Sequence, residues 1–399
     1  MKKKRYDGYQ SYSYLEPGRD YEEFDLAPQF GRVPAYDLDL SDTQEVRAQQ
    51  LIADSIIISL HEHPTLFPAD IDETFAYNRS GRHRTGYEGL AQSGMDAVFD
   101  NFMDGTACVT SKMGWKWEDI LYDIGMRFSD LAHQDFVIKA ERVQDIRDAY
   151  ETGRVALVPG LEASTPIENE IDRIDILYGF GIRQMGIAYS EANSLGSGLK
   201  EKGDGGLSAL GARAVERMNK LGIAIDVSHS GDQTSLDAIE ASQQPVFITH
   251  AGARGVWDTS RMKPDEVIIA CAERGGVICL EAAPHTTLSP QHPDHSIESV
   301  MDHFRYCVEL VGIEHVGFGP DTLYGDHYGL HKLFSAHLAL QEMTSGPEFE
   351  PVEYVAGLEN PTECFPNIVR WLVKHDYSDD EIKAVIGENA LRVLEHVWH

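Results

Sequence analysis

Histidine and carboxylate residues at a few places along this chain have the types and spacing of metal ligands. His61 and His63 flank Glu62, and residues two apart on a strand point to the same side, so both imidazoles can reach one ion while Glu62 points elsewhere. Glu162, His229 and His250 each follow a short apolar run. Imidazole and carboxylate ligands suit Zn, Mn, Fe or Co better than Ca or Mg. The sequence therefore predicts a site for such ions.

The single carboxylate in this set predicts how the ions are arranged. Glu162 stands between two pairs of histidines and is well suited to bridging two divalent ions, with zinc the first choice and Mn, Fe or Co the alternatives. Two such ions lower the pKa of a shared water and polarise a substrate carbonyl, which is the chemistry of metal-assisted hydrolysis. Asp321 follows a further apolar run and could pass the proton of that water to the leaving group. The alternative for Asp321 is a cap on the next helix.

The elements that would position these residues begin near Asp54. Short β-branched, apolar runs alternate with longer stretches of helical periodicity, which is the pattern of βαβ units. Near-continuous apolar runs such as 246–248 indicate strands buried on both faces, as in a parallel sheet covered by helices. Eight strands are predicted, at residues 55–60, 95–102, 155–160, 182–188, 223–228, 245–249, 276–280 and 315–319. Eight repeats favour an α/β fold of the closed (β/α)8 TIM type over an open sheet.

Closure of this barrel would bring the candidate residues together. The carboxyl ends of barrel strands surround one mouth, where enzymes of this architecture carry their reactive groups. Five of the eight predicted strands run into the residues of interest, which are His61 with His63, Glu162, His229, His250 and Asp321. The sequence therefore predicts one site at the carboxyl-terminal mouth.

The remaining segments predict an extension, a loop and closing helices. Residues 1–45 are rich in Tyr, Asp, Gly and Pro and predict an N-terminal extension that lies on the surface or at a subunit contact. Residues 46–399 form the predicted barrel domain with its C-terminal helices, one of which begins with a capping sequence at Ser378. The Gly-rich segment 196–206 lacks the Gly-Lys-Ser/Thr ending of a phosphate-binding loop, so we expect a flexible lid or loop.

Composition narrows the classes of partner and compartment. Lys and Arg number 34 against 65 Asp and Glu, which gives a formal charge of -31. Such a charge disfavours nucleic acid and anionic membranes and favours a small-molecule substrate. Neither a secretion signal nor an apolar run of about 20 residues is recognisable, so we expect a soluble protein. The five scattered cysteines are expected to be reduced and mostly buried in a cytoplasmic protein.

Several of these segments resemble the renal (membrane) dipeptidase family, peptidase family M19, a branch of the amidohydrolase superfamily. The resemblance covers about residues 54–397 and is carried by 160–162, 218–222, 225–229, 249–254, 315–321 and 387–389. It implies that Glu162 bridges two metals, that His229 and His250 bind the second, and that Asp321 handles the proton. It also implies that Arg254 binds the carboxylate of a dipeptide-like substrate, a task that suits the planar guanidinium fork. Relatives are often homodimers, which makes a homodimer possible here.

Two residues depart from the family pattern. The family usually has His-x-Asp after the first strand, whereas this chain has His61-x-His63, so the first ion loses one negative ligand charge. After the fourth strand a family histidine thought to touch the substrate carbonyl is replaced by Tyr189, ahead of Asn193. Tyr189 and Asn193 are predicted substrate contacts, and a phenol would stabilise an oxyanion differently from a histidine.

These observations together predict a metal-dependent hydrolase. The leading hypothesis is cleavage of an amide bond in a small carboxylate-bearing substrate, such as a dipeptide or an N-acyl amino acid, by metal-activated hydroxide. An ester, a lactam or another C–N bond is the first alternative, favoured by His63 and Tyr189. A metal-binding homologue without catalytic activity is the second.

Overall fold

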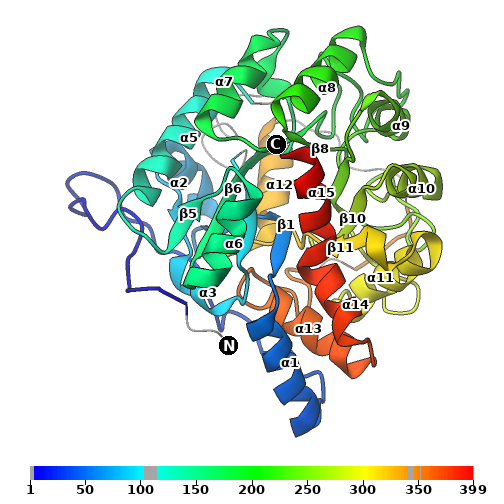
Figure 1. The fold of residues 1–399 in the computed structure, drawn as a ribbon. Helices are drawn as coiled ribbons and strands as arrows, with labels where there is room; N and C mark the ends of the chain where they lie inside the picture. The colour runs from blue at the N-terminus through cyan, green and yellow to red at the C-terminus, as the bar shows by residue number, and fades with distance from the viewer. Residues whose placement is uncertain (1–3, 103–114, 339–345, 351, 399) are drawn as a thin grey trace.

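A parallel sheet of eight strands in sequential order forms the centre of the computed structural model, which describes residues 4–102, 115–338, 346–350 and 352–398 (Figure 1). The strands are β1 (Ile58–Glu62), β4 (Ala97–Asn101), β6 (Val155–Leu161), β7 (Gln184–Gly186), β8 (Ala224–Asp226), β9 (Phe247–Ala251), β10 (Val277–Leu280) and β11 (Val316–Phe318). Every one of them overlaps a predicted strand. The apolar runs therefore identified the barrel strands correctly, because burial on both faces makes most of their residues apolar.

The first and last strands meet and close the sheet. Asp321 N donates to His61 O (3.0 Å) and His63 N donates to Thr322 O (2.9 Å). Gly319 helps this close approach, because a Cβ there would lie only 3.0 Å from His61 N and 2.1 Å from Thr249 O of β9. The prediction of a (β/α)8 TIM-type barrel is confirmed.

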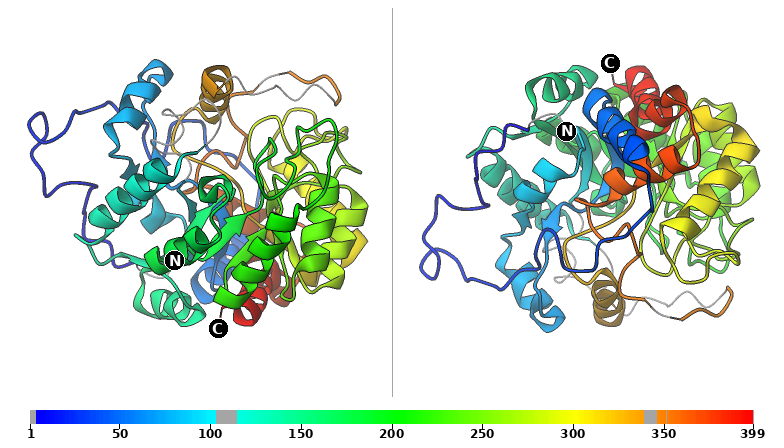
Figure 2. Two further views of the ribbon diagram at one scale, coloured as in Figure 1. Left: turned by 90° about the horizontal axis from the view of Figure 1, so that it is seen from above. Right: turned by 90° about the horizontal axis from the view of Figure 1, so that it is seen from below.

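Helices surround the barrel on the outside (Figures 1 and 2). They are α1 (Asp42–Asp54), α2 (Thr74–Ser80), α3 (Tyr87–Gln92), α5 (Trp117–Leu131), α6 (Val143–Thr152), α7 (Asp172–Phe180), α8 (Ala209–Leu221), α9 (Asp232–Ala241), α10 (Asp265–Glu273), α11 (Ile297–Val311), α12 (His327–Leu338), α13 (Cys364–Lys374), α14 (Asp379–Lys383) and α15 (Asn389–Val397). The larger apolar core lies between these helices and the outward-facing strand residues. Such a helical layer covers the outer face of every strand, as the continuous apolar runs require.

A second apolar core fills the barrel and is closed by α15. Inward-facing residues such as Ile58, Phe99 and Phe247 pack in one cluster with Leu394 and Trp398 at the end of the chain. The α14 helix that leads toward α15 begins with the predicted capping box, in which Ser378 Oγ accepts from Glu381 N. The C-terminal helices thus close the end of the barrel opposite the mouth, as expected.

Some short elements were not predicted. Strand β5 (Val137–Lys139) pairs with the first half of β6, and β2 (Thr65–Leu66) pairs antiparallel with β3 (Arg84–Thr85). Runs of two or three residues carry too little periodicity to be recognised in the sequence. Because β2 follows the first strand directly, this two-stranded pair lies at one side of the mouth.

The N-terminal extension is fastened to its own barrel. Within residues 4–40 the structure has no helix, as expected, and α1 begins at Asp42, slightly earlier than the predicted boundary at 46. Lys4 Nζ pairs with Asp96 Oδ1 (2.6 Å), and Tyr12 N donates to Asp130 Oδ1 (2.8 Å). Part of the extension projects from one side of the molecule (Figure 2). A role for it in a homodimer stays a prediction.

Two further expectations concern the cysteines and the membrane. Cys271, Cys279, Cys307 and Cys364 are buried free thiols, as predicted, and Cys108 lies outside the described residues. Within the described ranges, no helix combines the length and the apolar character that crossing a bilayer would require.

Candidate metal centre

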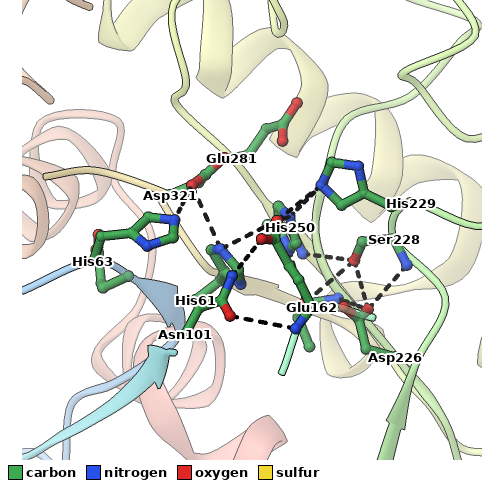
Figure 3. A network of polar contacts seen from close by, with 12 residues as sticks. His61, His63, Asn101, Glu162, Asp226, Ser228, His229, His250, Glu281 and Asp321 are labelled. Carbon is green, nitrogen blue, oxygen red and sulfur yellow. Dashed lines mark hydrogen bonds and ion pairs between the residues drawn. The ribbon is translucent and has the colours of Figure 1, made fainter. Parts of the chain in front are cut away.

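The predicted ligands come together at the carboxyl-terminal mouth of the barrel (Figure 3). His61 lies in β1 and His250 in β9, while Glu162 directly follows β6. Three groups have ligand atoms within 4.8 Å of one another, and they are His61 with His63 and Glu162, Glu162 with His229 and His250, and His61 with His250 and Asp321. Glu162 belongs to the first two groups. All of these residues are buried.

Glu162 lies at the centre of the cluster. Its Oε1 is 3.0 Å from His229 Nε2, 3.2 Å from His250 Nε2 and 3.7 Å from His61 Nε2. Its other oxygen accepts a hydrogen bond from Asn101 Nδ2, and Asn101 Oδ1 accepts from Glu162 N (3.3 Å). Asn101, the last residue of β4, therefore orients the shared carboxylate. We did not predict it, although the strand-end argument would have indicated it if amides had been considered with histidines and carboxylates.

Asp321 faces the other side of the cluster in an unusual backbone conformation. Its Oδ1 lies 3.2 Å from His63 Nε2 and 3.5 Å from His61 Nε2. Its φ is 56°, in the left-handed region that residues other than glycine seldom adopt. Glu62 holds the next residue in place, because its Oε2 accepts from both Thr322 N and Thr322 Oγ1 (2.8 Å each). Glu62 thus points away from the ligands, as expected, and ties the end of β1 to the segment that carries Asp321.

The protonation states favour metal binding. Burial lowers the pKa of His229 to about 3 and that of His250 to about 4, although Glu162 opposes both shifts. Burial alone would raise the pKa of Glu162, but hydrogen bonds from the two histidines hold it well below its usual value. The imidazoles of His61 and His63, which lie close to Asp321, likewise hold the pKa of Asp321 well below its usual value against the effect of burial. Neutral imidazoles and ionised carboxylates are the forms that bind divalent cations.

The chemistry of the donor atoms also fits a divalent cation. His61 Nε2 is buried and has no hydrogen-bond partner in the described part of the chain, and an unsatisfied buried nitrogen is costly unless something binds it. His250 Nδ1 contacts Thr249 Oγ1 (2.8 Å), which fixes the ring with Nε2 toward the cluster. Such outer contacts are typical of metal-binding histidines. The donor set is that of a site for a transition-metal ion.

A buried network not predicted from the sequence locks β8 against β9. Asp226 Oδ1 accepts from Ser228 Oγ (2.6 Å) and from Thr249 N (3.0 Å). Ser228 Oγ in turn accepts from His250 N (3.1 Å) (Figure 3). The role of Asp226, which is to fix the backbone at His250, was not predicted, because it depends on the contact of β8 with β9 in the folded barrel.

The three predicted substrate contacts lie at different places. The ring of Tyr189 stacks on His229, with centroids 4.1 Å apart, so it borders the metal centre. Asn193 uses its amide within its own loop, donating to Ile187 O (2.8 Å) and accepting from Leu195 N (2.8 Å). The guanidinium of Arg254 is paired with Asp232: its Nη1 donates to Asp232 Oδ2 (2.6 Å) and its Nη2 donates to Asp232 Oδ1 (2.9 Å).

An unpredicted ion pair, Arg261 with Glu281, lies beside the metal centre. Arg261 Nη2 donates to His250 O (3.0 Å) and to Glu281 Oε2. Glu281 directly follows β10, and Figure 3 shows it next to Asp321. Burial acts to raise the pKa of Glu281 and Asp321 adds to this rise, whereas the adjoining Arg261 guanidinium opposes it. The strand-end position could have indicated Glu281, whereas Arg261 lies in an irregular loop that gave no signal.

A cavity of about 550 Å³ lies beside this centre. It is lined by Gly198, Leu199, Glu201, Asp204, Gly231, Asp232, Arg254, Asp258, Thr259, Ser260, Gly346 and Pro347. The wall adjoins the ligand loop, because Leu199 N donates to His229 O (3.0 Å). Part of the Gly-rich segment 196–206 thus forms one side of this cavity, and its role as a lid stays a prediction.

A closed parallel barrel with buried histidines and carboxylates at its carboxyl-terminal mouth is an arrangement typical of metal-dependent hydrolases. Residues 45–334 match the membrane dipeptidase family (peptidase family M19), and the chain belongs to this family. The resemblance noted in the sequence is therefore confirmed.

Individual relatives agree with this assignment. The dipeptidase verJ of Clonostachys rogersoniana is 26% identical over 380 residues, which cover 90% of this chain and 88% of that protein. An amidohydrolase from Pseudomonas aeruginosa has a similar fold, with a TM-score of 0.73 and 24% identity over 88% of this chain and 99% of that one. A metallopeptidase from Rhodobacter sphaeroides, liganded with a phosphinate mimic of the dipeptide L-Ala-D-Ala, has a TM-score of 0.67 and 18% identity over 86% of this chain and 100% of that one.

Proposed function

We propose that this protein hydrolyses the amide bond of a dipeptide or a similarly small substrate at a centre of two divalent ions. The observation that carries the proposal is the position of Glu162, which is shared by two ligand groups whose donor atoms lie within 4.8 Å of one another. The dipeptidase names of the relatives support the substrate class. Zinc is the first choice of metal, with Mn, Fe or Co as alternatives.

Each residue has a task in this proposal. His61, His63 and Glu162 would hold one ion, and Glu162, His229 and His250 the other. When bound, the ions supply a more acidic water and polarise the scissile carbonyl. Asp321, with its carboxylate aimed at His63 and His61, would accept the proton of the attacking water and deliver it to the leaving amine.

We propose that Arg261 binds the C-terminal end of the substrate. The sequence had indicated Arg254, but both nitrogens of its fork are held by Asp232. Arg261 contacts His250 O, and its Nη1 has no hydrogen-bond partner among the described residues. Tyr189 would form a wall beside His229. The proposed substrate role of Asn193 is weakened because its amide already serves its own loop.

The proposal is tested with purified protein reconstituted with Zn or Mn. The reconstituted protein is expected to cleave at least one member of a broad dipeptide panel, measured by release of free amino acids. Inactivity across the whole panel, with both ions bound, would reject the dipeptidase function.

A non-peptide ester, lactam or other C–N bond is the second candidate, favoured by His63. The first ligand group has one carboxylate and two histidines, so its ion keeps more positive charge than it would with an additional carboxylate. A hydrolysis screen that includes esters and lactams separates the two candidates. Activity confined to that part of the screen would favour the second.

A further inference from the structure

We propose that Glu281 is a specificity-determining residue, which makes the site prefer a substrate whose end at Arg261 is a neutral carboxamide over one with a free carboxylate. The inference rests on the proposed function, because it takes Arg261 to meet the substrate. It replaces the carboxylate-bearing substrate expected from the sequence.

The first argument is charge. Arg261 and Glu281 form an ion pair in which both side chains are buried, with 5% of Arg261 and none of Glu281 exposed. A buried guanidinium already paired with a carboxylate has little attraction left for a second one, since the new anion is repelled by the first at close range. An arginine compensated in this way is a poor receptor for a free carboxylate.

The second argument is the hydrogen-bonding pattern. Arg261 Nη1, a donor, and Glu281 Oε1, an acceptor, are both buried and have no hydrogen-bond partner within the described ranges. The nearby Thr286 hydroxyl donates to Ala283 O (2.6 Å). A primary amide offers one acceptor and two donors, so it can satisfy both atoms, whereas a carboxylate offers only acceptors. A buried polar group left unsatisfied in the complex costs affinity.

The third argument is position. Arg261 donates to the backbone of the ligand His250, and Glu281 lies next to Asp321 (Figure 3). The pair therefore borders the reacting centre. Both the pair and the metal ligands are buried. The Arg261 guanidinium, which donates directly to Glu281 Oε2, opposes the rise in pKa that burial imposes on Glu281 and so favours its carboxylate form.

The acidic residues around the pair also disfavour an anionic substrate. The cavity beside the centre is lined by Glu201, Asp204, Asp232 and Asp258, and its one arginine, Arg254, is paired with Asp232. The chain as a whole carries a formal charge of -31. This field lowers the local concentration of anions and leaves neutral molecules unaffected.

The test compares Ala-Leu with Ala-Leu amide as substrates of the reconstituted holoenzyme, following alanine release by mass spectrometry. The wild type is expected to show kcat/KM higher for the amide by about tenfold or more. Glu281→Gln preserves the size of the side chain and restores the net charge of Arg261, so it is expected to shift this ratio toward the free acid by about tenfold. Glu359→Gln is the matched control, because Glu359 is also buried and paired with an arginine, Arg32. It should leave the ratio unchanged.

A binding measurement separates failure of this inference from failure of the proposed function. Calorimetry on metal-depleted protein compares leucinamide with leucine, which requires no hydrolysis. Tighter binding of the amide in the wild type, lost in Glu281→Gln, supports the inference even if no peptide is cleaved. Two results would overturn the inference and leave the dipeptidase function standing. One is cleavage and binding that favour the free acid, and the other is a wild type that does not distinguish the amide from the free acid.

Discussion

At the scale of single residues, the central feature is a set of side chains held in the forms that bind metal. His229 and His250 are neutral because burial opposes their protonation, and Glu162 is ionised because the two imidazoles lie within hydrogen-bonding distance of its Oε1. The protein thus prepares the ligands by burial and hydrogen bonding before any cation arrives. This arrangement has consequences for catalysis and for the pH dependence of stability.

Replacement of Asp321 by asparagine should separate metal binding from catalysis. The amide keeps the shape of the side chain but cannot accept the proton, so kcat is expected to fall by about 10²- to 10⁴-fold. The ions are held mainly by other residues in this account, so metal content measured by elemental analysis should stay the same. Full activity in Asp321→Asn would remove Asp321 from the proton transfer, and a wild type inactive on every substrate would favour a non-catalytic homologue.

The metal-depleted protein should lose stability as the pH falls below about 6.5. The unfolded chain protonates its histidines near 6.5, whereas folded His229 and His250 resist protonation down to about 3 and about 4. Because the unfolded state binds more protons in this window, the free energy of unfolding decreases from pH 6.5 toward pH 4. Thermal unfolding at several pH values measures this. His250→Gln should flatten the dependence, and a melting temperature constant between pH 7 and pH 5 would contradict it.

At the scale of elements, the link between the end of β1 and the segment after β11 positions Asp321. Thr322→Val keeps the shape of the side chain but removes one of the two hydrogen bonds to buried Glu62. We expect it to destabilise the protein by about 1–3 kcal/mol in urea unfolding. It should also lower kcat, because the backbone that aims Asp321 is released. Thr322→Ser, which retains the hydroxyl, is the control. Equal stability of the two variants would show that the hydroxyl is unimportant.

The character of the individual elements also explains how much of the fold and of the site could be predicted from the sequence. The eight barrel strands were recognised because burial on both faces makes them continuously apolar, and closure then placed His61, Glu162 and His250 together. Strand β5 was missed because three residues show no periodicity. Arg261 was missed because an irregular loop determines its position, and no rule of spacing relates a loop residue to the ligands. The pairing of Arg254 with Asp232 was also missed, because it depends on how the two segments lie in the folded barrel.

At the scale of the whole molecule, the excess of acidic residues should influence which substrates arrive. Raising the salt concentration from about 0.01 M to about 0.1 M shortens the screening length from about 30 Å to about 10 Å. KM for an anionic substrate such as an N-acyl amino acid is therefore expected to fall with added salt, because repulsion by the charge of -31 is screened. KM for a neutral substrate serves as the control and should change little. An identical salt response for both would contradict a role for the field.

The measurement that tests the account most directly is the number of divalent ions bound per chain. Metal-depleted protein is titrated with zinc, freed of unbound metal by gel filtration and analysed for its element content. We predict two ions per chain, and fewer in Glu162→Ala, because both ligand groups share this carboxylate. A wild-type chain that remains empty, or that holds a single ion unaffected by loss of Glu162, would contradict the proposed centre.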